Sequence, residues 1–157
     1  MLTATIRDNL DPFQERSDSE IWKALRTVQL EGWVRDQVGT SNGDTGLKAL
    51  VTEAGGNMSV GQRQLICLAR ALLKRPRVLI LDEATASVDY ETDRLIQKAL
   101  RTEFDCTVLT IAHRLNTIMD VDRIVVLSNG RVLENGAPAA LLALDGGVFK
   151  EMVETTE

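Results

Sequence analysis

The sequence predicts an α/β fold with a largely parallel sheet. Val78 to Leu81 and Thr107 to Ile111 are short apolar runs without polar alternation, a pattern typical of strands buried on both faces. Segments with helical spacing of apolar residues precede and separate these runs. Helices that alternate with buried strands favour a parallel sheet.

The first part of the chain is expected to be helical. Residues 1–13 carry neither a helix cap nor a strand start. Ser17 to Glu20 has the pattern of a capping box, and the apolar spacing after it predicts a helix that ends at Gly32. Residues 39–56 are polar and dotted with glycine, which predicts a loop.

The next helix begins at a second capping-box pattern, Ser59 to Gln62. Apolar residues follow on one helical face as far as Leu72, and Pro76 ends the helix. Asp89 or Ser87 is expected to cap a further helix that runs to about Arg101.

The last part of the chain contains a strong hairpin turn at Ser128-Asn129-Gly130. The elements expected there are, in order, a short helix at Arg114–Met119, hairpin strands at Ile124–Leu127 and Arg131–Glu134, and short helices near Pro138 and Val148.

Composition and charge limit which classes of protein the sequence can belong to. The 157 residues are 44% hydrophobic and 26% charged, as in an ordinary globular domain. The net charge of −5 argues against a nucleic-acid partner, and the cluster of Lys74, Arg75 and Arg77 is interpreted as a solvated corner. Cys67 and Cys106 form no CxxC pair and are interpreted as buried thiols. The apolar runs fall short of the roughly 20 residues of a membrane helix, so no transmembrane segment is expected.

Two adjacent carboxylates, Asp82 and Glu83, end the first apolar run. Successive side chains along a strand point to opposite faces, so the two are expected to have different roles at the carboxyl end of the strand. Asp82 suits Mg²⁺ held through water, and Glu83 suits polarisation of an attacking water. The alternative is that both residues cap the following turn.

Ser59, Val60, Gly61 and Gln62 place a hydroxyl at a helix cap and a glycine in the first turn. Free N–H donors and the positive end of the helix dipole make such a terminus an anion site. A capping box alone explains the same residues.

His113 is the single histidine and follows the second apolar run, on the same rim of the sheet as Asp82. Contact with a terminal phosphate and ordinary packing are both open for it. Asp89, seven residues beyond Asp82, has helix capping as its simplest explanation.

Together these motifs resemble those of the ATP-binding cassette (ABC) ATPases. MSVGQ matches the signature motif LSGGQ, VLILDE the Walker B motif with its catalytic glutamate, SVD the D-loop, and His113 the switch histidine. TIRDNLDPF, the valine of the signature and DEATASVD are most similar to the second nucleotide-binding domain of C-subfamily transporters, the multidrug-resistance-associated group. The resemblance covers nearly the whole chain.

The resemblance implies a P-loop NTPase-type fold, present as a partial nucleotide-binding domain. Its helical signature portion would span about residues 1–75, and its Walker B to C-terminal portion residues 76–157. It implies ATP and Mg²⁺ as ligands, with Asp82 near Mg²⁺. Glu83 would be the general base and His113 the γ-phosphate sensor.

The resemblance also implies that the signature acts in trans. Ser59, Val60, Gly61 and Gln62 would close over ATP held by a second nucleotide-binding domain. Asp89 would couple the two sites across the interface between the domains. The other partners implied are the transmembrane domains of the parent transporter.

No glycine-rich loop closing with Gly-Lys-Ser or Gly-Lys-Thr occurs in the sequence. In the family this loop, the Q-loop glutamine and the aromatic that stacks on adenine lie upstream of the segment that matches here. The phosphate-loop strand normally lies between those at 107–111 and 124–127, so unpaired backbone groups are expected in this sheet. We therefore expect a truncated gene product or gene fragment that does not hydrolyse ATP alone.

The parent protein is expected to use ATP hydrolysis to drive export, and this chain to be held on the cytoplasmic side of a membrane through it. The isolated chain is expected in the cytoplasm. One alternative is a non-catalytic module that donates its signature to a partner's ATP site. Another is a DNA-repair or translation ATPase, against which the acidic balance and TIRDNLDPF argue.

Overall fold

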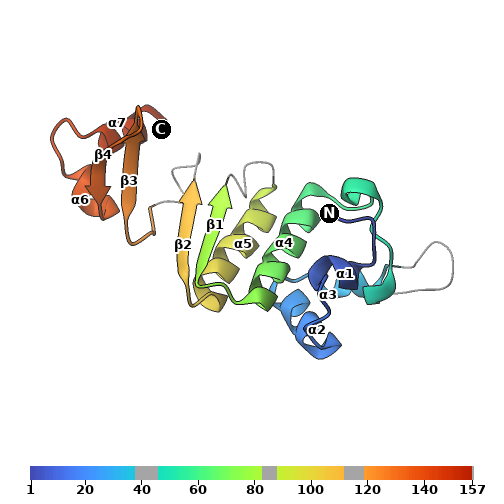
Figure 1. The fold of residues 1–157 in the computed structure, drawn as a ribbon. Coiled ribbons are helices and arrows are strands. Elements are labelled where there is room, and N and C mark those ends of the chain that lie inside the picture. Colours follow the sequence, from blue (N-terminus) through green and yellow to red (C-terminus); the bar gives the residue numbers. More distant parts are fainter. Residues whose placement is uncertain (38–45, 83–87, 112–118, 157) are drawn as a thin grey trace. The chain divides into compact units, whose positions relative to one another are not determined.

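The computed structural model describes residues 1–37, 46–82, 88–111 and 119–156, and Figure 1 shows their helices and strands. They belong to two compact units, Met1–Thr110 and Ile111–Glu157. The elements in chain order are α1 (Ile6–Leu10), α2 (Asp18–Thr27), α3 (Glu31–Arg35), the 3₁₀ turns η1 (Gly46–Lys48) and η2 (Glu53–Gly55), α4 (Val60–Lys74), β1 (Val78–Asp82), α5 (Tyr90–Glu103), β2 (Thr107–Ile111), β3 (Ile124–Ser128), β4 (Arg131–Gly136), α6 (Pro138–Leu142) and α7 (Val148–Thr156). None of these described helices has the length and apolar character needed to cross a bilayer.

Side-chain caps determine where α1 and α2 begin. The Thr5 hydroxyl accepts a hydrogen bond from the Asp8 amide at 3.0 Å, so the opening segment does contain a helix cap and the sequence expectation is wrong there. The capping box of Ser17 and Glu20 is confirmed at the start of α2. Each such cap contributes about 1 kcal/mol to helix stability.

The predicted end of the second helix at Gly32 is wrong, because α2 ends at Thr27. Gln29 adopts a φ of 57°, a left-handed conformation that a right-handed helix does not accommodate. The next residue, Leu30, is buried and donates its amide to the Leu25 carbonyl at 2.9 Å. The chain therefore turns at this point and begins α3.

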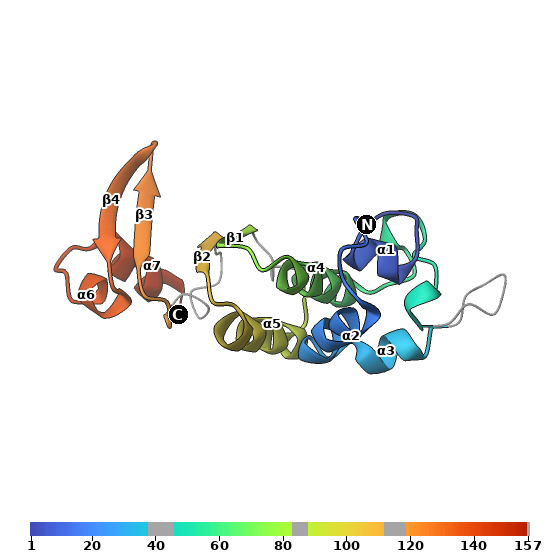
Figure 2. The same cartoon turned by 60° about the horizontal axis from the view of Figure 1, so that its bottom comes forward.

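The core of the first unit is aliphatic and is built around α4, which contacts α1, α2 and α5 (Figure 2). Ile21 and Leu25 of α2, Val34 of α3 and Ile66 of α4 have no exposed surface. Burying a side chain of this size contributes about 1.5–3 kcal/mol. This packing holds the amino-terminal end of α4 in a defined position.

Residues 46–56 pack more closely than the predicted loop. The Val51 amide donates to the Ala4 carbonyl at 2.8 Å, and the Ile6 amide donates to the Ala49 carbonyl at 2.9 Å. Their apolar side chains close the core beside α1, so the stretch has the irregular backbone predicted for it but is packed against the core. The first part of the predicted loop lies outside the described residues.

β1 and β2 form a two-stranded sheet, and both arrows point the same way in Figure 1. The prediction that both strands are buried is wrong: Ile80 is 63% exposed and Leu109 is 55% exposed. Each strand has only the other as a strand partner within the described residues, so most of their side chains face solvent. The apolar runs identified the strands, but burial depends on what covers them.

The two cysteines are free, with Cys67 exposed and Cys106 half-buried, so the interpretation of both as buried thiols is wrong. Cys67 lies off the face of α4 that packs into the core, which explains its exposure. Lys74, Arg75 and Arg77 are exposed, as expected for a solvated corner.

The second unit is a hairpin packed against two helices. β3 and β4 pair antiparallel around Asn129 and Gly130, whose φ angles of 49° and 74° fit the predicted hairpin turn. Helices α6 and α7 confirm the two predicted near Pro138 and Val148, whereas the helix expected at Arg114–Met119 falls, apart from its last residue, outside the described residues. Phe149 of α7 is the most buried side chain of this core.

Glu134 of β4 ties the hairpin to α7, since its carboxylate accepts hydrogen bonds from the amides of Val148 and, at 3.0 Å, Phe149. We expect Glu134→Ala to expose these amides and to weaken α7 by about 1 kcal/mol, as loss of a helix cap does. Hydrogen exchange at the two amides should become about fivefold faster. The exposed residue Glu151 provides the control, and Glu151→Ala exchange rates equal to those of Glu134→Ala would contradict this assignment.

Candidate functional site

The predicted signature residues lie at the amino-terminal end of α4. The Ser59 amide donates to Gln62 Oε1 at 2.8 Å, and the Gln62 amide donates to Ser59 Oγ at 3.1 Å, so the predicted capping box is present. Within the described part of the chain, the amides of Val60 and Gly61 meet no acceptor. They leave two donors at the positive end of the helix dipole.

Asp89 is the N-cap of α5, as the sequence predicted. Its Oδ1 accepts the Thr92 amide at 2.9 Å, and its Oδ2 accepts the Thr92 hydroxyl at 2.7 Å. These hydrogen bonds, the one from the Thr92 amide first, lower the pKa of the Asp89 carboxyl below its usual range. Both carboxylate oxygens are therefore held on the side of Thr92.

The first turns of α4 and α5 touch at Gly61. A Cβ built on Gly61 would lie 3.1 Å from both Oγ1 and Cγ2 of Thr92, closer than ordinary van der Waals contact. The apolar side chains beside this contact are exposed, Val60 by 40% and Tyr90 by 79%. The signature turn and the Asp89 turn thus share one accessible edge of the first unit.

Asp82 is the last residue of β1, and its side chain is exposed. Each of α4 and α5 runs back to the start of the strand that follows it, so the first turns of both helices lie toward the carboxyl ends of β1 and β2 (Figure 1). Glu83 and His113, the two predicted catalytic residues, lie outside the described residues. Among those described, no three His, Cys, Asp or Glu side chains gather into a metal-ligating group.

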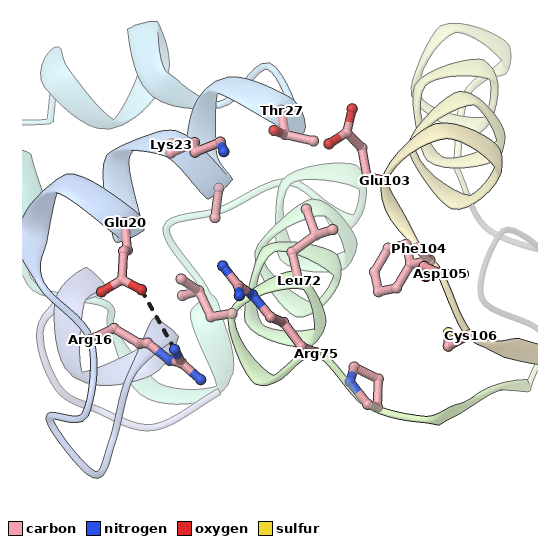
Figure 3. A pocket seen from close by; sticks show the side chains of 13 residues that line it. Arg16, Glu20, Lys23, Thr27, Leu72, Arg75, Glu103, Phe104, Asp105 and Cys106 are labelled. Carbon is pink, nitrogen blue, oxygen red and sulfur yellow. Dashed lines mark ion pairs between the residues drawn. The ribbon is translucent and has the colours of Figure 1, made fainter.

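A hollow of about 410 Å³ lies at the opposite end of α4, between the carboxyl-terminal ends of α4 and α5 and helix α2 (Figure 3). Leu72 and Phe104 line it, and Arg16 and Glu20 form an ion pair of 3.5 Å at its edge. None of the predicted site residues lines this hollow. Its charged side chains carry both signs, so it is no dedicated anion site.

Sequence reasoning missed Thr92, the residue that links the two predicted motifs. Its position three residues after Asp89 is where an N-cap carboxylate finds an amide, so a capping analysis indicates the bond to Asp89. The contact with Gly61 joins residues 31 positions apart and leaves no local signal.

The comparisons with known proteins agree on one family. The family model described as "ABC transporter" matches residues 2–86, more than half of the chain. A human protein named ATP-binding cassette sub-family C member 2 is 53% identical over 150 residues, which cover 95% of this chain and 9% of that protein. ABC transporter C family member 3 of Dictyostelium discoideum is 50% identical over 157 residues, or 99% of this chain and 11% of the relative. The chain thus spans about a tenth of the length of these curated relatives.

A solved structure, that of a bacterial Atm1-family ABC exporter with ATP bound, is similar with a TM-score of 0.85 and 31% identity. The match covers 99% of this chain and 26% of the exporter chain. The fold is therefore that of an ABC ATPase. By sequence match and by fold, and as its motifs predicted, this chain belongs to the ABC transporter family and is similar throughout to its C subfamily.

Proposed function

We propose that this chain is part of the nucleotide-binding domain of an ABC exporter, in which ATP binding and hydrolysis drive transport across a membrane. Family membership and the likeness to an ATP-bound exporter support this function. A yeast relative named metal resistance protein YCF1 is 53% identical over 92% of this chain. The parent protein would supply the transmembrane domains and hold this domain at the cytoplasmic face.

One observation carries the proposal for the site: the first turns of α4 and α5 form a single exposed edge. Ser59 and Asp89, which belong to separate motifs, are brought to it by the contact between Gly61 and Thr92. The free amides of the α4 terminus suit a phosphate group, and exposed Tyr90 suits a protein interface, where tyrosine is enriched. We infer that this edge closes over ATP held by a second nucleotide-binding domain.

The hydrolytic roles follow from the ends of β1 and β2. Glu83, directly after β1, would accept a proton from the attacking water. His113, two residues after β2, would donate a hydrogen bond to the terminal phosphate. Asp82 would hold the metal side of the site through water. Mg²⁺, when bound, spreads the negative charge of the transferring phosphoryl group.

Asp82 fits this use of Mg²⁺. Its carboxylate is exposed at a strand end, so water molecules can lie between it and an ion. Mg²⁺ takes one or two carboxylates together with phosphate oxygens and several waters. A site of this kind does not require the cluster of three ligating side chains that the described residues lack.

The 157 residues contain no phosphate loop, and in the family that loop supplies most contacts to the triphosphate. We expect the 157-residue chain alone to release phosphate from ATP at the background rate, with Glu83→Gln showing no further decrease. A phosphate-release assay that includes a complete nucleotide-binding domain as positive control measures this. Turnover above background that Glu83→Gln abolishes would refute the expectation.

The exposed edge formed by the first turns of α4 and α5 also favours a second candidate, a non-catalytic module that donates its signature in trans. Such a module would pair with a complete nucleotide-binding domain only when that domain holds ATP. The first function requires the whole parent protein, whereas this one requires only the exposed edge of the first unit.

Ser59→Arg tests the donated signature. The substitution replaces the cap hydroxyl with a long cation, and we expect ATP-dependent co-purification with a complete C-subfamily nucleotide-binding domain to weaken about tenfold or more. Ser59→Thr keeps a hydroxyl and should pair normally.

Ser17→Arg is the matched control, since it breaks the other capping box of the chain, at α2. Both arginine variants lose about 1 kcal/mol of helix stability. Equal loss of pairing in the two variants would show a general folding effect and would rule out a specific role for Ser59.

A further inference from the structure

Gly61 and Asp89 belong to motifs 28 residues apart, and a single side chain lies between them. Thr92 presents its hydroxyl oxygen and its methyl carbon to Gly61, each 3.1 Å from where a Cβ would lie. The same hydroxyl donates to Asp89 Oδ2 at 2.7 Å. Thr92 is half-buried, whereas Asp89 is exposed.

The geometry leaves Thr92 little freedom. A β-branched side chain has few χ1 positions, and two of its substituents are already committed to Gly61 and Asp89. Rotation of Thr92 about χ1 would break its hydrogen bond to Asp89. A shift of the signature turn that displaces Thr92 would therefore change the hydrogen bond between Thr92 and the Asp89 carboxylate.

We propose that Thr92 is a positioning residue that couples the signature turn at Gly61 to the carboxylate of Asp89. It holds the two groups in one arrangement, so that they meet a partner domain together. The absence of a side chain at Gly61 then serves this contact, in addition to any role of its backbone toward phosphate. The consequence for pairing rests on the proposed function, but the coupling itself does not.

Ionisation of Asp89 reports the coupling. Its pKa is lowered first by the Thr92 amide and then by the Thr92 hydroxyl, so these bonds stabilise the fold when the carboxylate is charged and are lost as the pH falls through the folded-state pKa. Glu91 and Asp93 are the acidic residues in the same turn of α5, and every variant below retains them.

The test is an NMR titration of the Asp89 carboxyl carbon in the 157-residue chain. We expect Gly61→Ala to raise the pKa of Asp89 toward its usual value, because the new methyl group displaces Thr92. Adding Thr92→Ser to Gly61→Ala removes the crowded methyl group, keeps the hydroxyl, and should return the pKa toward that of the wild type. Gly32→Ala is the matched control, since a Cβ at this other helical glycine meets no atom within 4 Å.

An unchanged Asp89 pKa in Gly61→Ala, or no recovery in the double variant, would overturn the proposal. If Gly61→Ala does not fold, the same titration of Asp89 in Thr92→Val and Thr92→Ser tests the proposal. The valine variant should raise the pKa and shift the amide resonances of Gly61 and Gln62, while the serine variant should leave the pKa low. Because Thr92→Val keeps the amide bond and loses only the hydroxyl bond, a pKa equal to that of the wild type, not one that is merely low, would overturn the proposal as well.

ATP-dependent pairing separates this inference from the proposed function. If the edge binds a partner's ATP, Thr92→Val should weaken pairing about tenfold, the worth of one hydrogen bond to a charged group, and Thr92→Ser should not. Absence of pairing in the wild type would refute the donated signature. The coupling between Thr92 and Asp89 would then be tested by the titration alone. Normal pairing in Thr92→Val would refute the functional consequence of the coupling.

Discussion

The contact between Gly61 and Thr92 sets the spacing of α4 and α5 at the end where their predicted functional groups lie. Any larger residue at Gly61 would meet the hydroxyl and methyl group of Thr92 at 3.1 Å. Both helices are anchored in the same apolar core, α4 through Leu65 and Ile66 and α5 through Ile96 and Ala99. Each helix runs back to the start of the next strand, so α4 leads into β1 and α5 leads into β2. This connection places the capped starts of both helices on the side of the carboxyl ends of β1 and β2, and the close approach at Gly61 brings the two helix starts together.

Features that depend on a few neighbouring residues were predictable from the sequence. The capping boxes at Ser17 and Ser59, the cap at Asp89 and the turn at Asn129-Gly130 are all present, because each requires only side chains and backbone groups within four positions. Two local features were missed, the Thr5 cap of α1 and the early end of α2. The early end of α2 results from the left-handed conformation of Gln29, which glutamine itself does not signal.

Features that depend on distant parts of the chain were not predictable in the same way. Runs of valine, leucine and isoleucine indicate strands, but the exposure of Ile80 and Leu109 depends on which elements cover the sheet. The exposure of Cys67 likewise depends on which elements cover α4. Its apolar neighbours in the sequence predict burial, but it lies off the face of α4 that packs into the core. For the site, the types of residue were evident from motifs, whereas the role of Thr92 required the packing of two helices. Glu83 and His113 remain sequence-based assignments.

The distribution of groups between the two units bears on how the domain can work. Ser59, Gly61, Asp82 and Asp89 all belong to the unit that ends at Thr110, and so does the exposed edge formed by the first turns of α4 and α5. The proposed hydrolytic site would need further groups, since Glu83 and His113 lie outside the described residues and the sequence holds no phosphate loop. The proposed closure over a partner's ATP would need only the edge formed by the first turns of α4 and α5. The edge formed by the first turns of α4 and α5 is therefore ordered without the proposed catalytic residues. Such preorganisation lowers the free-energy cost of ordering these turns in the proposed pairing.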